Sequence, residues 1–189
     1  MNNARWNRSW MLAAIGVAGL MLVASGYARA EDQKTKETIS EAKNTIATFK
    51  KADSGLSTFF ESSAGYVVFP SVGKGGFIVG GAGGKGILFE GGLPVGGAKI
   101  SQVTVGAQVG GQRYAEVIFF ENPAAVAKFK KGDFSLAAQV SAVAAAEGAS
   151  SNAKYSNGVA VFTVAENGLM AEASVGGQKL KFVPFSKEK

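Results

Sequence analysis

The chain has 189 residues, with 20 basic and 14 acidic side chains and a formal net charge of +6. This length is enough for one sizeable hydrophobic core, so we expect a single domain. The sequence contains no histidine and no cysteine, which excludes disulfides, thiol catalysis, histidine-based triads and most metal sites. We therefore expect no enzyme and no cofactor, although a pair of carboxylates brought together by the fold stays open.

The first thirty residues have the layout of a cleaved signal peptide. Two arginines precede an apolar run over residues 11–24, and the small residues Ala28 and Ala30 follow it. The alternative is a retained membrane anchor, but the run is shorter than the ~20 residues that span a bilayer. We expect cleavage after Ala30, secretion across the inner membrane, a periplasmic protein that can lie peripherally on an envelope membrane, and one domain over residues 31–189. Removal of residues 1–30 takes away three arginines and no acid, so the net charge falls from +6 to +3, and nucleic-acid binding is not supported.

Residues 32–52 are predicted to form a helix with one narrow apolar stripe, which includes Ile39, Ile46 and Phe49. Three basic residues lie on the rest of this helix: Lys43, Lys50 and Lys51. Two interpretations stay open. The stripe packs on a sheet while the lysines are solvated, or the helix lies at an interface with anionic lipid. A short second helix or turn is indicated by three further residues: Leu56, Phe59 and Phe60.

Sixteen of the 26 glycines fall in residues 64–120, interleaved with strand-forming residues, which indicates a β scaffold with close backbone approaches. Within it, Gly81–Gly86 satisfies the G-x-G-x-x-G pattern of dinucleotide-binding proteins. The residues that follow, Ile87–Gly92, are predicted to form a strand, whereas the dinucleotide fingerprint needs a helix there. We therefore reject that function and predict a glycine-rich hairpin at this position.

Residues 100–109 alternate in the manner of a strand, with Val103 and Val105 on one face and polar or small residues on the other. We expect one face to be buried, and residues 114–120 to form its hairpin partner after two glycines. Asn122 then precedes a short predicted helix that ends at a glycine. Its basic residues are interpreted as a solvated last turn: Lys128, Lys130 and Lys131.

The alanine-rich segment 136–146 is predicted, weakly, as a strand. Residues 159–165 and 169–175 are predicted to form a hairpin around an Asn-Gly turn, and residues 179–182 form a last strand. Together these elements predict an α+β fold, a single domain with a strongly curved, partly closed antiparallel β-sheet and a few flanking helices.

Three stretches resemble one known family. The run GYVVFPSVGKGGFIVGG over Gly65–Gly81 is similar to the opening signature of the SYLF domain, a lipid-binding module also found in yeast actin-associated endocytic proteins. VTVGAQVGGQ over Val103–Gln112 resembles its central strand pair, and GLMA over Gly168–Ala171 resembles its "KGLMAG" hairpin. The resemblance covers roughly residues 35–183.

This resemblance implies a non-enzymatic domain that binds membrane lipids, in eukaryotic members phosphoinositides and in fungal members also actin. For an exported bacterial member, the expected partner is an anionic phospholipid of the envelope. The lysines expected to contact its headgroup lie on the first helix and in glycine-rich loops: Lys43, Lys50, Lys51, Lys74 and Lys85. The alternative is a periplasmic structural or assembly protein that pairs with a protein partner, itself included, through exposed strand edges.

Overall fold

A computed structural model describes most of the chain after residue 30. The described segments are residues 31–76, 79–105, 111–132, 134–137, 140–165 and 177–185. The chain divides into two compact units, Met1–Glu37 and Thr38–Lys189. Residues 31–37 of the first unit are helical, and residues 38–52 of the second unit are helical as well, as predicted. None of the helices within these segments combines the length and the apolarity needed to cross a bilayer.

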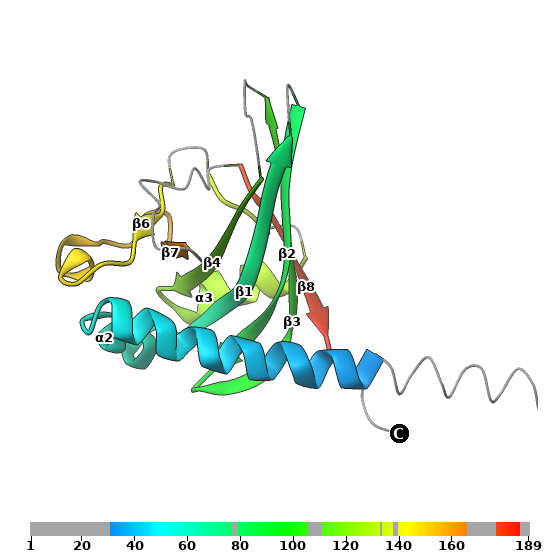
Figure 1. Ribbon diagram of the computed structural model, residues 1–189. Helices are drawn as coiled ribbons and strands as arrows, with labels where there is room; N and C mark the ends of the chain where they lie inside the picture. The colour runs from blue at the N-terminus through cyan, green and yellow to red at the C-terminus, as the bar shows by residue number, and fades with distance from the viewer. Residues whose placement is uncertain are drawn as a thin grey trace, which may run out of the picture. The chain divides into compact units, whose positions relative to one another are not determined.

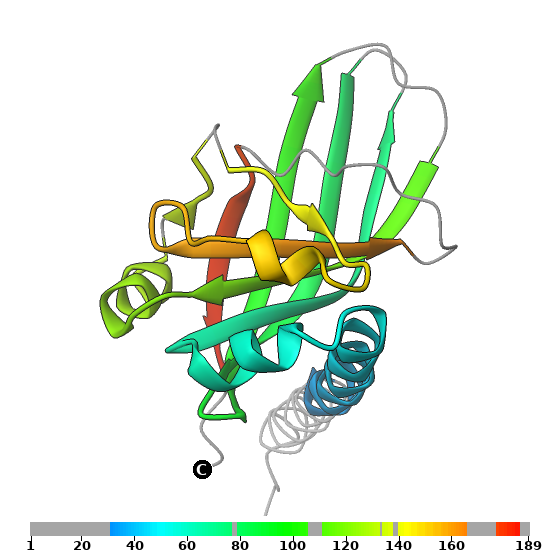
Figure 2. The ribbon, with the colours of Figure 1, turned by 90° about the vertical axis from the view of Figure 1, so that its left-hand side faces the viewer.

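The second unit is built on a curled eight-stranded sheet with the strand order β5-β8-β3-β2-β1-β4-β7-β6. Figure 1 shows the strands edge-on, and Figure 2 shows β4 and β7 running across the upright β2 and β3. The strands are β1 (Gly65–Gly76), β2 (Val79–Glu90), β3 (Leu93–Val105), β4 (Gly111–Phe120), β5 (Phe134–Ser135), β6 (Val143–Ala144), β7 (Val159–Ala165) and β8 (Lys179–Pro184). All neighbouring pairs are antiparallel except β6 with β7. The predicted α+β fold with a strongly curved sheet is confirmed.

Strand β4 lies between β1 and β7, so the predicted hairpin between residues 100–109 and 114–120 is wrong. Every residue of β4 from Tyr114 to Phe120 is buried. A strand that is buried on both faces is most stable in the interior of a sheet, with cover on each side. Burial on both faces therefore favours the place of β4 between β1 and β7. The two glycines before β4 do not make it the partner of β3.

Strand β2 is continuous from Val79 to Glu90, so the predicted hairpin at Gly81–Gly86 is also wrong. The glycines there serve close approach between strands. A Cβ added at Gly84 would lie 2.7 Å from the carbonyl oxygen of Ser71, and one at Gly86 would lie 2.5 Å from that of Val68. Because no helix follows the G-x-G-x-x-G pattern, the rejection of dinucleotide binding stands.

The two faces of the sheet are covered by different helices. On one face, here called the α2 face, Phe49 and α2 (Leu56–Ser62) pack against Ile87 and Phe89 of β2. Phe49 belongs to the helix over residues 38–52, here called the N-terminal helix. On the opposite face, the α3 face, α3 (Pro123–Lys130) packs in a second cluster with Leu88 of β2. The alternation of side chains along a strand explains why Ile87 and Leu88 belong to different clusters.

The turn between the N-terminal helix and α2 is fixed by a buried carboxylate. Asp53 accepts hydrogen bonds from the backbone N–H of Ser150 at 2.6 Å, from the Ser150 hydroxyl at 3.0 Å and from the backbone N–H of Gly55 at 3.0 Å. Ser150 belongs to the 3-10 helix η1 (Ala149–Asn152). This contact joins residues 97 apart in the chain and holds the helical layer on the α2 face.

The other predicted elements divide by the strength of their local signals. Helix α3 begins at Pro123, and the Asn122 side chain accepts a hydrogen bond from the backbone N–H of Ala125 at 3.0 Å, as capping predicts. Strands β7 and β8 lie where strands were predicted.

The strand predicted over residues 136–146 is wrong, because the described part of it contains only β6. The small alanine side chains of this segment contribute little packing on a pleated surface. The signal peptide (residues 1–30) and the turn and second strand of the predicted hairpin (residues 166–175) lie outside the described residues.

Glycine to alanine substitutions test the close approach in β2. Gly86→Ala should destabilise the fold by about 1–3 kcal/mol, because the new methyl group meets the Val68 carbonyl oxygen and the Phe69 ring. Gly73→Ala in β1 is the matched control, since a Cβ there meets nothing within 4 Å, and should change stability by less than about 1 kcal/mol. Urea unfolding measures both; equal losses would show that the spacing of β1 and β2 does not require glycine at position 86.

Candidate functional site

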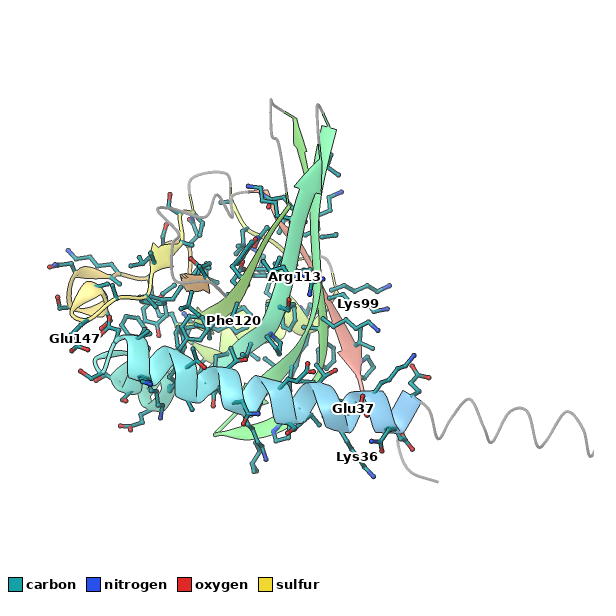
Figure 3. The ribbon with its side chains drawn as sticks, in the orientation of Figure 1. Lys36, Glu37, Lys99, Arg113, Phe120 and Glu147 are labelled. Atoms are coloured by element: carbon teal, nitrogen blue, oxygen red, sulfur yellow. The ribbon has the colours of Figure 1, made fainter. Side chains whose placement is uncertain are left out.

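The register of β2, β3 and β8 places three lysines side by side. Lys85 of β2 pairs with Lys99 of β3, and Lys99 pairs with Lys181 of β8. Residues that are directly opposite in antiparallel strands project from the same face. The three side chains therefore form one row across three strands, and all three are exposed. In Figure 3, Lys99 extends away from the strands.

A second row lies two residues further along β3 and β8. Ser101 pairs with Lys179, which in turn pairs with Ser135 of β5. These side chains line a groove with a volume of about 920 Å³. We call it the lysine groove and define it by its polar lining: Lys85, Lys99, Lys179, Lys181, Ser101 and Ser135. Its lysines project from the α2 face, because Lys85 is two residues from Ile87, and side chains two residues apart in a strand share a face. Residues of the α3-face cluster also line the groove: Ile100, Phe134 and Leu180.

The described residues that line the groove include four lysines and no carboxylate. In the part of the chain that the structure describes, the ion pair that forms joins Lys130 to Glu90 and involves none of the four lysines. Like charges directly opposite each other in a sheet are destabilising. Four cations around one concave surface also create a positive potential that attracts anions. The arrangement suits an anionic ligand.

The lysines predicted from the sequence do not gather at one place. Lys85 is in the groove, whereas Lys74 pairs with Ala82, a member of the α3-face cluster, and so projects from the other side of the sheet. Both belong to strands and not to the glycine-rich loops that were predicted. Lys50 lies over the Phe60 ring at 5.3 Å from its centroid. Lys43 and Lys51 are exposed on the N-terminal helix. A role of any of the five in lipid binding stays a prediction.

Sequence reasoning missed three of the four groove lysines: Lys99, Lys179 and Lys181. A local signal was present, since Lys179 and Lys181 flank Leu180 with the spacing that places both on one face of a strand. Their proximity to Lys85 depends on the pairing of strands that are up to about a hundred residues apart in the chain, and no local pattern specifies that register.

In β3 the buried face is the one that carries Gln102, and not the valine face that the sequence predicts to be buried. Gln102 is 6% exposed, and Val103 is 80% exposed. Ile100 lies in the α3-face cluster. Gln102 is two residues further along the strand and projects from the same face, so Val103 projects from the opposite face into solvent. The expectation that the apolar face of this strand is covered is therefore wrong at Val103. An exposed apolar side chain shares a face with Lys99 and Ser101.

Glu116 is the most perturbed acid among the described residues. Its side chain is fully buried, and Gln178 Nε2 donates a hydrogen bond to its Oε2 at 3.1 Å. Burial raises the pKa of this carboxyl from an ordinary value of 4.5 to about 8, against the lowering effect of the Gln178 hydrogen bond. No second carboxylate among the described residues contributes to the shift of its pKa. No cluster of metal-ligating side chains is found in those residues either.

Two comparisons with known proteins agree with the sequence resemblance. Residues 101–183 match the family model Ysc84, described as "Las17-binding protein actin regulator". Over 73 residues the chain is 36% identical to Beta cell expansion factor A from Aeromonas veronii. That match spans 39% of this chain and only 28% of the relative. The predicted resemblance to the SYLF family is confirmed.

Replacement of Glu116 tests the buried carboxyl. Between about pH 5 and 8 the unfolded chain has lost this proton while the folded chain keeps it, so its contribution to stability falls as the pH rises. Glu116→Gln is neutral throughout and should reduce this decline by more than about 1 kcal/mol. Urea unfolding at both pH values measures it. A wild-type slope in the variant would show that Glu116 ionises as freely in the folded state as in the unfolded one.

Proposed function

We propose that this protein is a non-enzymatic lipid-binding module of the bacterial cell envelope, and that the lysine groove binds anionic phospholipid headgroups. The observation that carries the proposal is the row of Lys85, Lys99 and Lys181, with no carboxylate among the described residues that line the groove. The resemblance to the SYLF family, whose known members bind membrane lipids, supports it. The layout of residues 1–30 supports export to the periplasm, where an anionic leaflet would be the partner.

The expected energies are consistent with peripheral and reversible binding. A lysine near an anionic leaflet contributes ~1 kcal/mol, so stable binding needs several lysines that act together. The four groove lysines meet that condition at one place. Val103, exposed on the same face, offers an apolar contact to the lipid beside the charged one.

The helix lysines extend the same surface. Residues 38–52 pack on the α2 face through Ala42 and Phe49, so the exposed Lys43 and Lys51 lie on the same side of the sheet as the groove. We include them as secondary contacts. Lys50 is directed toward Phe60, which packs on β1 and β4 away from the groove. Lys74, on the α3 face, is left out of this contact.

The second candidate is a protein-binding or assembly role. The family description names Las17 and actin for its members, and those are eukaryotic partners. Here the observation that favours a protein partner is the pair of exposed large apolar side chains Leu93 and Val103, which are 69% and 80% exposed. They belong to opposite ends of β3 and form no continuous apolar patch, so we place this role second.

Co-sedimentation with vesicles tests the proposal. Protein purified after export is mixed with vesicles of neutral lipid, and of neutral lipid with added anionic phospholipid, at low and at physiological salt. Binding should require the anionic lipid and weaken with salt, because exposed charges are screened. Lys181→Gln should weaken it about fivefold, whereas Lys154→Gln, which removes an exposed lysine outside the groove, should not.

Two outcomes would contradict the proposal. Absence of binding to every vesicle composition would remove lipid binding. Self-association that depends on protein concentration and not on salt, without vesicle binding, would favour the assembly role instead.

A further inference from the structure

We propose that the lysine groove binds a ligand that carries two linked phosphate groups, in preference to one that carries a single phosphate. The inference rests on the proposed function and specifies its ligand. It is drawn from the number, spacing and charge of the side chains in the groove.

The strand positions of the four lysines cover an area wider than one phosphate. Neighbouring strands lie about 5 Å apart, so the row from Lys85 through Lys99 to Lys181 extends over about 10 Å. Along β8, Lys179 and Lys181 are two residues apart, which adds about 7 Å in the perpendicular direction. Lysine side chains are long enough to converge on one phosphate, but only by bringing their positive charges together. Two phosphates would let each pair of lysines contact an anion of its own.

The groove divides naturally into two halves. Lys85 and Lys99 form a pair across β2 and β3, and Lys179 and Lys181 form a pair along β8. Lysine is a point charge that does not fix the orientation of a phosphate. Hydroxyl groups can do so, and Ser101 and Ser135 stand on either side of Lys179 as its cross-strand partners. Each half therefore offers two cations, and the β8 half offers hydroxyl donors as well.

The charge balance favours the same ligand. A phosphodiester carries one negative charge, which leaves most of the repulsion among four lysines in place. Two phosphates in one molecule bring at least two negative charges, one for each half of the groove. Once the first phosphate is bound, the second binds as an intramolecular step at a high effective concentration. Covalent linkage between the phosphates should therefore increase affinity beyond the effect of charge alone.

Two sources could supply such a ligand: a lipid whose headgroup contains two phosphates, or a soluble molecule with two linked phosphates. The experiment compares vesicles of neutral lipid with diphosphatidylglycerol, which has two phosphates, and vesicles with twice the molar fraction of phosphatidylglycerol, which has one. The two surfaces carry the same charge density. Soluble pyrophosphate and orthophosphate, at equal total charge, are added as competitors in parallel.

The proposal predicts at least about fivefold tighter binding to the diphosphatidylglycerol vesicles, and displacement by pyrophosphate at lower concentration than by orthophosphate. Direct binding of pyrophosphate, with weak binding to both vesicles, would assign the ligand to the soluble source. Equal binding to the charge-matched vesicles together with equal competition would overturn the inference and leave the proposed function intact. Binding to neither vesicle and to neither phosphate would overturn both.

Variants in each half of the groove locate the effect. Lys179→Gln and Lys85→Gln should each reduce the preference for linked phosphates, because each removes a cation from one half. Lys154→Gln, with the same change in net charge, should retain it. Thermal unfolding checks that each variant folds, and either groove variant alone suffices for the test. A preference that survives both would place the site elsewhere on the protein and overturn the assignment to the groove.

Discussion

The register that joins β2, β3 and β8 decides where the charged side chains of this protein lie. Side chains alternate between faces along each strand. Ile87 and Lys85 therefore project from the same face, Ile87 where the helices cover it and Lys85 where they do not. A shift by one residue in β3 would move Lys99 to the α3 face and Ile100 out of its core. The apolar cluster that stabilises the fold therefore also fixes the groove. Packing of the buried residues stabilises the pairing of β2, β3 and β8, whereas repulsion among the lysines destabilises it.

The glycine-rich part of the sheet also carries the lysine row. Glycines 84 and 86 let β1 approach β2 closely, which gives the sheet room to curl without bulky side chains. The same strands carry few large residues beyond the helices, so Lys85 and Lys99 have little apolar cover and stay in solvent. Stability is provided at the other end of the sheet, where Phe60, Tyr66 and Phe119 pack as an aromatic cluster with ring centroids 4.8–5.9 Å apart. Functional sites commonly carry such local destabilisation, and the rest of the fold compensates for it.

Local patterns predicted the elements whose signals are local. The apolar stripe of the N-terminal helix and the Asn122 cap of α3 each depend on residues that are close together in the sequence. Both are present in the structure. The pairing of β4 with β1, the continuity of β2 through its glycines and the burial of Gln102 depend on contacts between distant segments, and the sequence patterns favoured other arrangements. For the site, Lys85 was identified because it adjoins the family signature. Lys99, Lys179 and Lys181 become part of it only through strand register, which charge and spacing along the chain do not reveal.

The most direct test of this account measures stability and binding in one variant. Lys99 is opposite both Lys85 and Lys181, so Lys99→Gln relieves two repulsive contacts and removes the central cation of the groove. The account predicts that the ligand-free variant is more stable than the wild type by about 0.2–1 kcal/mol at low salt, and that it binds anionic vesicles more weakly. Opposite signs of the two effects would show that the lysines are held together for a ligand. A variant that is less stable, or that binds equally well, would contradict the account.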